Sequence, residues 1–250
     1  MTYLTDKTIL VTGASRGIGA ATARVCHAAG ARVLAHASGM SDAAASVSGE
    51  LDIEFLFEDL GETGAGARLF AKALERAGRI DGVVNNAGVY LPSSLTGDDW
   101  ESGWAKTMAV NVQAPADICR AAITHFRHSK TETSNSMRII NIASRAGHRG
   151  DGVDHAAYAA SKAAVLGMTK TWARGLSGEG IELYAIAPGW VETRMAPQDI
   201  ENRKKAIADI PLGRVAAPEE VANMAAFLLT GASQSAVGAT FDINGASYVR

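Results

Sequence analysis

Tyr158 and Lys162 stand four residues apart in the stretch YAASK, and together they could move a proton. The surrounding residues AYAASKAAVLGMTKTWARGL are typical of a helix, in which positions i and i+4 lie on one face. A phenol titrates near 10, and a cation within about 4–6 Å lowers that pKa. The pair could therefore protonate a carbonyl oxygen or deprotonate an alcohol. An isolated pair of this kind is more often an exposed lysine beside a half-buried ring, so the surrounding motifs must decide.

Glycines cluster after the first apolar run of the chain. Gly13, Gly17 and Gly19 lie in TGASRGIG, which follows TILV and leads into a helical pattern. Glycines let the backbone turn tightly beside a pyrophosphate, and a helix N-terminus presents free N–H groups to it. The spacing differs from G-x-G-x-x-G, so a glycine-rich turn without a ligand is the alternative.

Three further motifs follow later apolar runs. They are NNAG (85–88), Ser144 in NIAS and PGWVET (188–193). NNAG alone could be a simple turn. Ser144 precedes Tyr158 by 14 residues, so the glycine-rich loop 145–157 could bring the helix with Tyr158 beside it. An acyl nucleophile is a poor interpretation of Ser144, because no G-x-S-x-G elbow surrounds it.

The elements that must position these residues alternate between short apolar runs and longer helical patterns. Strands are predicted at 8–13, 32–37, 53–59, 81–88, 138–144, 181–189 and 239–245, and helices at 17–29, 61–77, 98–126, 156–177, 199–209 and 218–230. This alternation predicts an α/β fold, a Rossmann-like doubly wound sheet of about seven parallel strands with helices on both faces. Its ligands would bind beyond the carboxyl ends of the strands, where the motifs fall. We expect one domain over residues 1–250, a surface excursion at 128–137 and a substrate loop at about 188–210.

Composition narrows the class of protein. The chain has 250 residues, is 47% hydrophobic and carries a net charge of -2, which gives no global case for a nucleic-acid partner. No window approaches 18 apolar residues, so a membrane span is not expected. Two isolated cysteines suggest no disulfide framework. We expect a soluble, cytoplasmic protein without a metal site.

The motifs together resemble one family. TGASRGIG, NNAG, Asn111 in MAVNVQAP, Ser144, YAASK and PGWVET occur in the order of the short-chain dehydrogenase/reductases, and the resemblance covers nearly the full chain. Three features depart from the pattern. The interval from Ser144 to Tyr158 is slightly long, the stretch 128–137 is long, and DINGA (242–246) replaces the common Asp-Gly-Gly. These differences concern the pocket wall, the surface and C-terminal packing. They make the substrate harder to identify from the sequence but leave the catalytic chemistry intact.

The resemblance implies roles for particular residues. Lys162 would also bond the nicotinamide ribose, Ser144 would steady the substrate oxygen, and Asp59 with Leu60 would contact the adenine. The implied catalytic residues are Asn111, Ser144, Tyr158 and Lys162. The implied nucleotide-binding residues are Gly13, Ser15, Arg16, Gly17, Ile18, Gly19, Ser38, Asp59, Leu60, Asn86, Ala87, Gly88, Tyr158, Lys162, Pro188, Gly189, Val191 and Thr193.

Asn111 also has a physical argument of its own. Pro115 follows it by four residues and has no N–H, so the carbonyl of Asn111 loses its helical donor and the helix should kink. A freed carbonyl needs a partner, and a water is the natural one. The family uses its matching asparagine to hold a water in a proton relay through the lysine. A kink that serves packing alone is the alternative.

The second predicted strand bears on the choice of nucleotide. NAD-preferring members carry an acid at the end of this strand, where this chain has Ala37. Arg16 lies in the glycine loop, where the family resemblance associates a basic residue with NADP. Ser38 could complete a phosphate cradle, and His36 would either add charge or point into the sheet. We therefore expect NADP(H) to be the preferred cofactor and leave NAD(H) as a second option. The alternative interpretation of Arg16 is a solvated side chain that binds no phosphate.

These expectations describe an NADP(H)-dependent carbonyl reductase or alcohol dehydrogenase. The pattern is most similar to 3-oxoacyl-thioester reductases. Arg174 of this chain matches a position that the resemblance associates with carrier-protein contact. A sugar, polyol or other secondary-alcohol dehydrogenase is the alternative, and a non-catalytic nucleotide-sensing protein is an alternative of another class. The resemblance also implies a homotetramer built through the helices near 98–126 and 156–177 and the C-terminal strand.

Overall fold

The computed structural model describes residues 3–129, 136–196 and 199–250. Within them, seven strands form one sheet in the order β3-β2-β1-β4-β5-β6-β7, and every neighbouring pair is parallel. The strands are β1 (Thr8–Val11), β2 (Arg32–Ala37), β3 (Phe55–Phe57), β4 (Gly82–Asn85), β5 (Met137–Ile142), β6 (Ile181–Pro188) and β7 (Thr240–Ile243). The predicted doubly wound sheet is confirmed. Its strand order reverses between β1 and β4, where such sheets bind their ligands.

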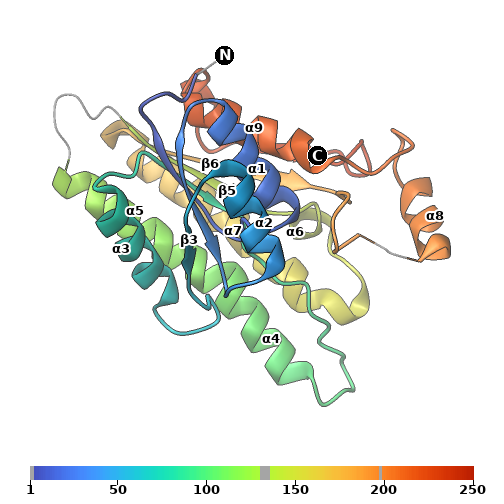
Figure 1. Cartoon of the computed structure of the whole chain (residues 1–250). Coiled ribbons are helices and arrows are strands. Elements are labelled where there is room, and N and C mark those ends of the chain that lie inside the picture. The colour runs from blue at the N-terminus through green and yellow to red at the C-terminus, as the bar shows by residue number, and fades with distance from the viewer. Residues whose placement is uncertain (1–2, 130–135, 197–198) are drawn as a thin grey trace.

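Helices cover both faces of the sheet (Figure 1). The α-helices are α1 (Gly17–Ala28), α2 (Asp42–Leu51), α3 (Ala65–Ala77), α4 (Trp100–Met108), α5 (Ala114–Ser129), α6 (Ala146–Arg149), α7 (Ala156–Leu176), α8 (Ile200–Ala208) and α9 (Pro218–Thr230). A π-helical turn, η1 (Ala109–Gln113), joins α4 to α5. Short 3-10 turns are η2 (Val153–His155), η3 (Ser177–Glu179) and η4 (Gln234–Ala236). Helices α1, α2 and α9 pack on one face, and α3, α5 and α7 pack on the other.

The core explains why the strands are mostly apolar in sequence. Side chains alternate across a strand, and Ile9 and Val11 of β1 join the core under α1 and α9 while Leu10 joins the opposite one. Because helices cover both faces, every residue of β1, β4, β5 and β6 is buried. The sheet is therefore a rigid support for the loops at its carboxyl edge.

Two helical predictions were incomplete. Helix α2 was not predicted, because it contains Ser46, Ser48 and Gly49 and buries only Ala44 and Val47. Its signal was the N-cap at Ser41, whose side chain accepts a hydrogen bond from the backbone N–H of Ala44. The stretch predicted as one helix over 98–126 is divided into α4, η1 and α5.

Several predicted elements are shorter than expected. The runs 53–59, 81–88 and 138–144 stop at Phe57, Asn85 and Ile142, because their last residues leave the sheet to form the walls of a cleft. Of the excursion predicted at 128–137, residues 130–135 lie outside the described residues. In the described part of the chain, no helix is long and apolar enough to cross a membrane.

Candidate active site

A cleft of about 1040 Å³ opens at the carboxyl ends of the strands. All the predicted site residues line it except Gly19 and Asn111, which lie behind its wall. Lining residues come from the loops after β1, β2, β3, β4, β5 and β6 and from α7. The sheet therefore brings the separate sequence motifs into one site.

The glycine turn after β1 is shaped by two left-handed residues and one close contact. Gly13 and Gly17 have φ values of 63° and 54°, which other residues adopt rarely. A Cβ at Gly19 would stand 2.1 Å from the carbonyl oxygen of Gly13, so only glycine lets the helix start so close to the turn. The start of α1 thus lies close to the turn, and its free backbone N–H groups suit a pyrophosphate.

Asn86 fastens this turn to the end of β4. Its side-chain Nδ2 donates hydrogen bonds to the carbonyl oxygens of Thr12 and Gly13, at 2.9 and 3.1 Å. The hydroxyl of Thr12 accepts from the backbone N–H groups of Asn86 and Ala87. NNAG is therefore more than a simple turn, because it fixes the shape of the glycine loop.

His36 holds the same turn from β2. The backbone N–H of Gly13 donates to Nδ1 of His36 over 3.2 Å, and Nε2 lies 3.0 Å from the carbonyl oxygen of Glu58. One nitrogen accepts and the other faces an acceptor, so the neutral ring with its proton on Nε2 fits both bonds. Burial lowers the pKa of His36. Of the two predicted possibilities, the side chain that points into the sheet is correct, and His36 adds no charge beside a phosphate.

Ser144, Tyr158 and Lys162 meet on the wall formed by β5 and α7. Ser144 accepts a hydrogen bond from the backbone N–H of Ala146 over 3.1 Å, and its hydroxyl also bonds Tyr158. The buried ammonium of Lys162 donates to the carbonyl oxygen of Ile142 over 2.8 Å and lies 5.7 Å from the centre of the Tyr158 ring. The phenol, the hydroxyl and the ammonium therefore lie close together on this wall.

The pKa values of this group differ from the expectation. Burial raises the pKa of Tyr158 to about 12; the Ser144 hydrogen bond lowers it and the Asp151 charge raises it. Burial also lowers the pKa of Lys162 to about 8. In the chain without a nucleotide, burial of the phenol is the largest effect, so the pKa of Tyr158 is raised and not lowered as expected.

Asn111 lies behind the wall and braces it. Its Oδ1 accepts from the backbone N–H of Val89 over 2.8 Å, and its Nδ2 donates to the Val89 carbonyl over 2.9 Å. Nδ2 also donates to the hydroxyl of Ser161 on α7. The predicted kink is present as the π-turn η1, which includes Asn111 and ends just before Pro115.

At the end of the cleft near the loops after β2 and β3, some polar and charged residues are exposed and others are held by hydrogen bonds. Arg16 and Ser38 are exposed there, which fits both a phosphate cradle and a solvated Arg16. Asp59 accepts from the backbone N–H of Gly61 and from Lys106, at 2.8 and 3.1 Å. Arg24, which sequence reasoning missed, lines the cleft but is held by both oxygens of Glu50.

Sequence reasoning also missed the residues near Ser144 and Tyr158. Tyr90 stacks on His155 with ring centres 3.9 Å apart and meets the Tyr158 ring edge-on at 4.8 Å. Arg145, Arg149, Asp151 and Trp190 also line the cleft and were not predicted as site residues. Each lies within a few residues of NNAG, NIAS or PGWVET, so proximity to the motifs was the available signal. They make this end of the cleft aromatic and charged.

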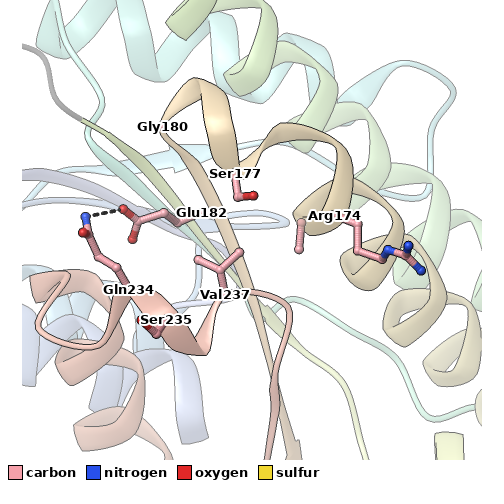
Figure 2. A pocket seen from close by; sticks show the side chains of 8 residues that line it. Arg174, Ser177, Gly180, Glu182, Gln234, Ser235 and Val237 are labelled. Atoms are coloured by element: carbon pink, nitrogen blue, oxygen red, sulfur yellow. Dashed lines mark hydrogen bonds between the residues drawn. The ribbon is translucent and has the colours of Figure 1, made fainter.

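A second cavity of about 470 Å³ lies at the opposite edge of the sheet, where β6 begins (Figure 2). Its polar wall includes a bond of 2.9 Å from Gln234 to Glu182, which also pairs with Arg138. Arg174 lies at its rim with its side chain directed away from Glu182 and Gln234 (Figure 2). No predicted catalytic or nucleotide-binding residue lines this cavity.

Known proteins share both the sequence and the fold. A family model described as Enoyl-(Acyl carrier protein) reductase matches residues 13–245. The 3-oxoacyl-[acyl-carrier-protein] reductase FabG of Thermotoga maritima is 33% identical over 97% of this chain and 98% of its own. The structure of the Pseudomonas aeruginosa RhlG/NADP active-site complex matches with a TM-score of 0.90, 33% identity and 100% of both chains. A blue fluorescent protein from a metagenomic library, in complex with NADPH, matches with a TM-score of 0.89 and 31% identity over 99% of this chain and 100% of that chain.

Proposed function

The chain belongs to the short-chain dehydrogenase/reductase family, and from this premise we propose that it reduces a carbonyl group with NADPH or oxidises the matching alcohol with NADP⁺. It is an NAD(P)-dependent oxidoreductase that acts on CH–OH and carbonyl groups. One observation carries the proposal. Ser144, Tyr158 and Lys162 line the same cleft as the glycine turn, so acid–base groups and a pyrophosphate cradle face one space.

The residues of the cleft fit a dinucleotide. The glycine turn would hold the pyrophosphate, Asp59 with Leu60 would contact the adenine, and Lys162 would bond the nicotinamide ribose. Gly17 lies against Thr193, which would close over the nucleotide from the loop after β6. The bound nucleotide supplies or accepts the hydride.

Tyr158 is the proposed acid. During reduction it donates its proton to the carbonyl oxygen, and in oxidation it takes the proton of the alcohol. The raised pKa keeps this proton on the phenol until the substrate needs it. Ser144 donates a hydrogen bond to the same substrate oxygen. Lys162 favours the phenolate that forms, because its positive charge is close and both groups are shielded from water.

Asn111 is proposed to serve the return of the proton. Its side chain is fully engaged with Val89 and Ser161, and Pro115 offers no N–H to its carbonyl. That carbonyl would hold a water between Lys162 and the solvent.

NADP(H) is proposed over NAD(H) because of the residues after β2. The strand ends at Ala37 without an acid that would repel a 2′-phosphate, and the exposed Arg16 and Ser38 border the place where it would lie. Two structural relatives were solved with NADP or NADPH, which supports the same choice.

A 3-oxoacyl thioester is the substrate that the relatives favour. FabG of Thermotoga maritima and a rhamnolipid-biosynthesis protein of Pseudomonas aeruginosa are both named 3-oxoacyl-[acyl-carrier-protein] reductases. Arg174 stands exposed near the end of α7, where a carrier protein could bind. A sugar, polyol or other secondary-alcohol dehydrogenase is the second candidate, and the charged residues beside Ser144 favour it. Both cysteines are free and buried, which is consistent with the reducing cytoplasm as the working compartment.

The test is a substrate panel with NADPH, followed by the loss of NADPH absorbance. The panel contains a 3-oxobutanoyl thioester, simple ketones and oxidised sugars, and the alcohols are tested with NADP⁺. We expect turnover with at least one carbonyl compound and its alcohol. Tight NADPH binding without turnover across the panel would contradict the proposal and favour a nucleotide-sensing protein.

A further inference from the structure

Arg145 is a buried cation at the substrate end of the cleft. It directly follows Ser144, lines the cleft, and leaves only 7% of its side chain exposed. Its Nη1 is buried and has no hydrogen-bond partner among the described residues. Buried polar groups are almost always hydrogen-bonded, and a charged donor without a partner is costly. Arg145 therefore contributes to the cleft wall and keeps a hydrogen-bond donor that no described residue uses.

Acidic neighbours balance the charge of Arg145 but leave its Nη1 without a hydrogen bond. Asp209, which follows α8, lies 3.5 Å from Nη1 and outside hydrogen-bond geometry. The same carboxylate pairs with Arg149 over 3.3 Å and is 54% exposed, so two guanidinium groups share one solvated acid. Asp151 adds a more distant negative charge, and the ring of Trp190 lies 6.0 Å from the guanidinium carbon. The two guanidinium groups and the two carboxylates balance in charge, but Nη1 of Arg145 makes no hydrogen bond to either carboxylate.

The backbone fixes where Arg145 lies. The N–H of Arg145 donates to the carbonyl oxygen of Pro188 over 2.9 Å, which ties the residue to the loop after β6. Ser144, one residue earlier, contacts Tyr158. An acceptor bound at Arg145 would therefore belong to the same small molecule whose oxygen lies between Ser144 and Tyr158.

We propose that Arg145 binds a carboxylate of the substrate, and that the chain prefers short oxo acids over their neutral esters and thioesters. A guanidinium matches a carboxylate with two parallel N–H donors, whereas a thioester offers one neutral oxygen. The inference rests on the proposed carbonyl reduction and replaces the thioester that the relatives favour with the matching acid. A 3-oxo acid has the skeleton of the 3-oxoacyl thioester with a carboxylate in place of the thioester.

The reaction itself is unchanged by this binding. The carbonyl carbon gains a hydride, which oxidises NADPH to NADP⁺, and the carbonyl oxygen gains the proton of Tyr158. The oxo acid becomes a hydroxy acid, and solvent returns a proton to Tyr158. Arg145 forms and breaks no covalent bond, so it acts on substrate affinity.

A matched pair of substrates, the acid 3-oxobutanoate and its methyl ester, tests the proposal. The Michaelis constant of each substrate is measured with NADPH for the wild type, Arg145→Gln, Arg145→Lys and Asp209→Asn. We expect the wild type to prefer the acid. Arg145→Gln should raise the Michaelis constant of the acid by roughly ten- to hundredfold, the usual effect of losing a hydrogen bond to a charged group, and leave that of the ester nearly unchanged. Arg145→Lys should retain part of the preference.

Asp209→Asn separates this proposal from a purely structural role, in which Arg145 only ties α6 to the end of α8. Under the proposal, this variant keeps the preference for the acid, because it removes a competitor for Arg145. Equal increases in the Michaelis constants of acid and ester for both Arg145→Gln and Asp209→Asn would establish the structural role and overturn the proposal. So would a wild type that reduces the ester as well as the acid, although carbonyl reduction would then stand. If no carbonyl compound consumed NADPH, the proposed function would fail and this inference with it.

Discussion

Burial acts on Tyr158 and Lys162 in opposite directions. It raises the pKa of the phenol to about 12 and lowers that of the ammonium to about 8, because each side chain loses water that would stabilise its charged form. For carbonyl reduction the phenol must hold a proton and the lysine must hold its charge. The lysine, not the tyrosine, therefore sets the alkaline limit of the site.

This difference predicts the pH dependence of reduction. Below pH 8 both groups are protonated and kcat/KM for NADPH, which reports on the free enzyme, should be constant. As the pH rises through about 8, Lys162 loses its charge and kcat/KM should fall. Steady-state kinetics between pH 6 and 10 measures the profile. In Lys162→Arg, which stays charged, any remaining activity should lack this step, and a flat wild-type profile to pH 10 would refute the assignment.

Two arginines near the nucleotide end predict different outcomes. Arg16 is exposed, whereas Glu50 already holds Arg24 with two oxygens. Arg16→Ala should raise the KM for NADPH by roughly ten- to hundredfold and hardly change that for NADH, since a hydrogen bond to a charged group is worth about 1.5–3 kcal/mol. Arg24→Ala is the matched control and should have a smaller effect. Equal losses for both nucleotides in Arg16→Ala would mean that the residue serves the pyrophosphate or the loop.

At the scale of elements, the sequence is informative where one physical effect dominates. The central strands are buried on both faces, so β1, β5 and β6 are mostly apolar, with the buried polar residues Arg138, Asn141 and Glu182 as exceptions. Helix α2 buries only two residues, and its composition gives a weak signal. The π-turn η1 could be predicted only as a kink at Pro115, because its form depends on how Asn111 meets the loop after β4.

The same contrast between predictable and unpredictable features holds for the candidate site. The strand-end motifs can be placed from sequence, because parallel strands bring their carboxyl ends to one edge. The orientation of a single side chain cannot, since it depends on neighbours distant in the chain. His36 could have faced either way until Glu58 and Gly13 were placed around it, and Arg145 was not distinguished from an exposed arginine.

His36 gives a test at this scale, because it joins β2 to the glycine turn. His36→Ala should lower the free energy of unfolding by about 1–3 kcal/mol, since it leaves the N–H of Gly13 without its acceptor. It should also raise the KM for NADPH and for NADH alike, in contrast to Arg16→Ala. Denaturant unfolding and kinetics with both nucleotides measure these effects. A selective loss of NADPH binding would instead place His36 at the 2′-phosphate.

At the scale of the whole molecule, we expect the chain to assemble as a tetramer. Phe227 on α9 and Val249 near the C-terminus are large apolar side chains exposed to solvent, and α7 carries many small residues that allow close approach of a second helix. Closed symmetric assembly is the usual form of a homo-oligomer. Light scattering at micromolar concentration should give about 104 kDa, four times the chain mass of 26.0 kDa. A monomer at that concentration would contradict the expectation.

The most direct test of the account concerns the proton that Tyr158 supplies. NADPH consumption by the wild type and by Tyr158→Phe is compared at saturating concentrations of nucleotide and of the best carbonyl substrate. The substitution removes the transferable proton with little change in volume, so kcat should fall roughly 10²–10⁴-fold, the usual contribution of a positioned acid–base group. The Kd of NADPH, measured by fluorescence titration, should change little, because the glycine turn and Lys162 are intact. A variant with nearly wild-type kcat would contradict the assignment of Tyr158 and the mechanism that rests on it.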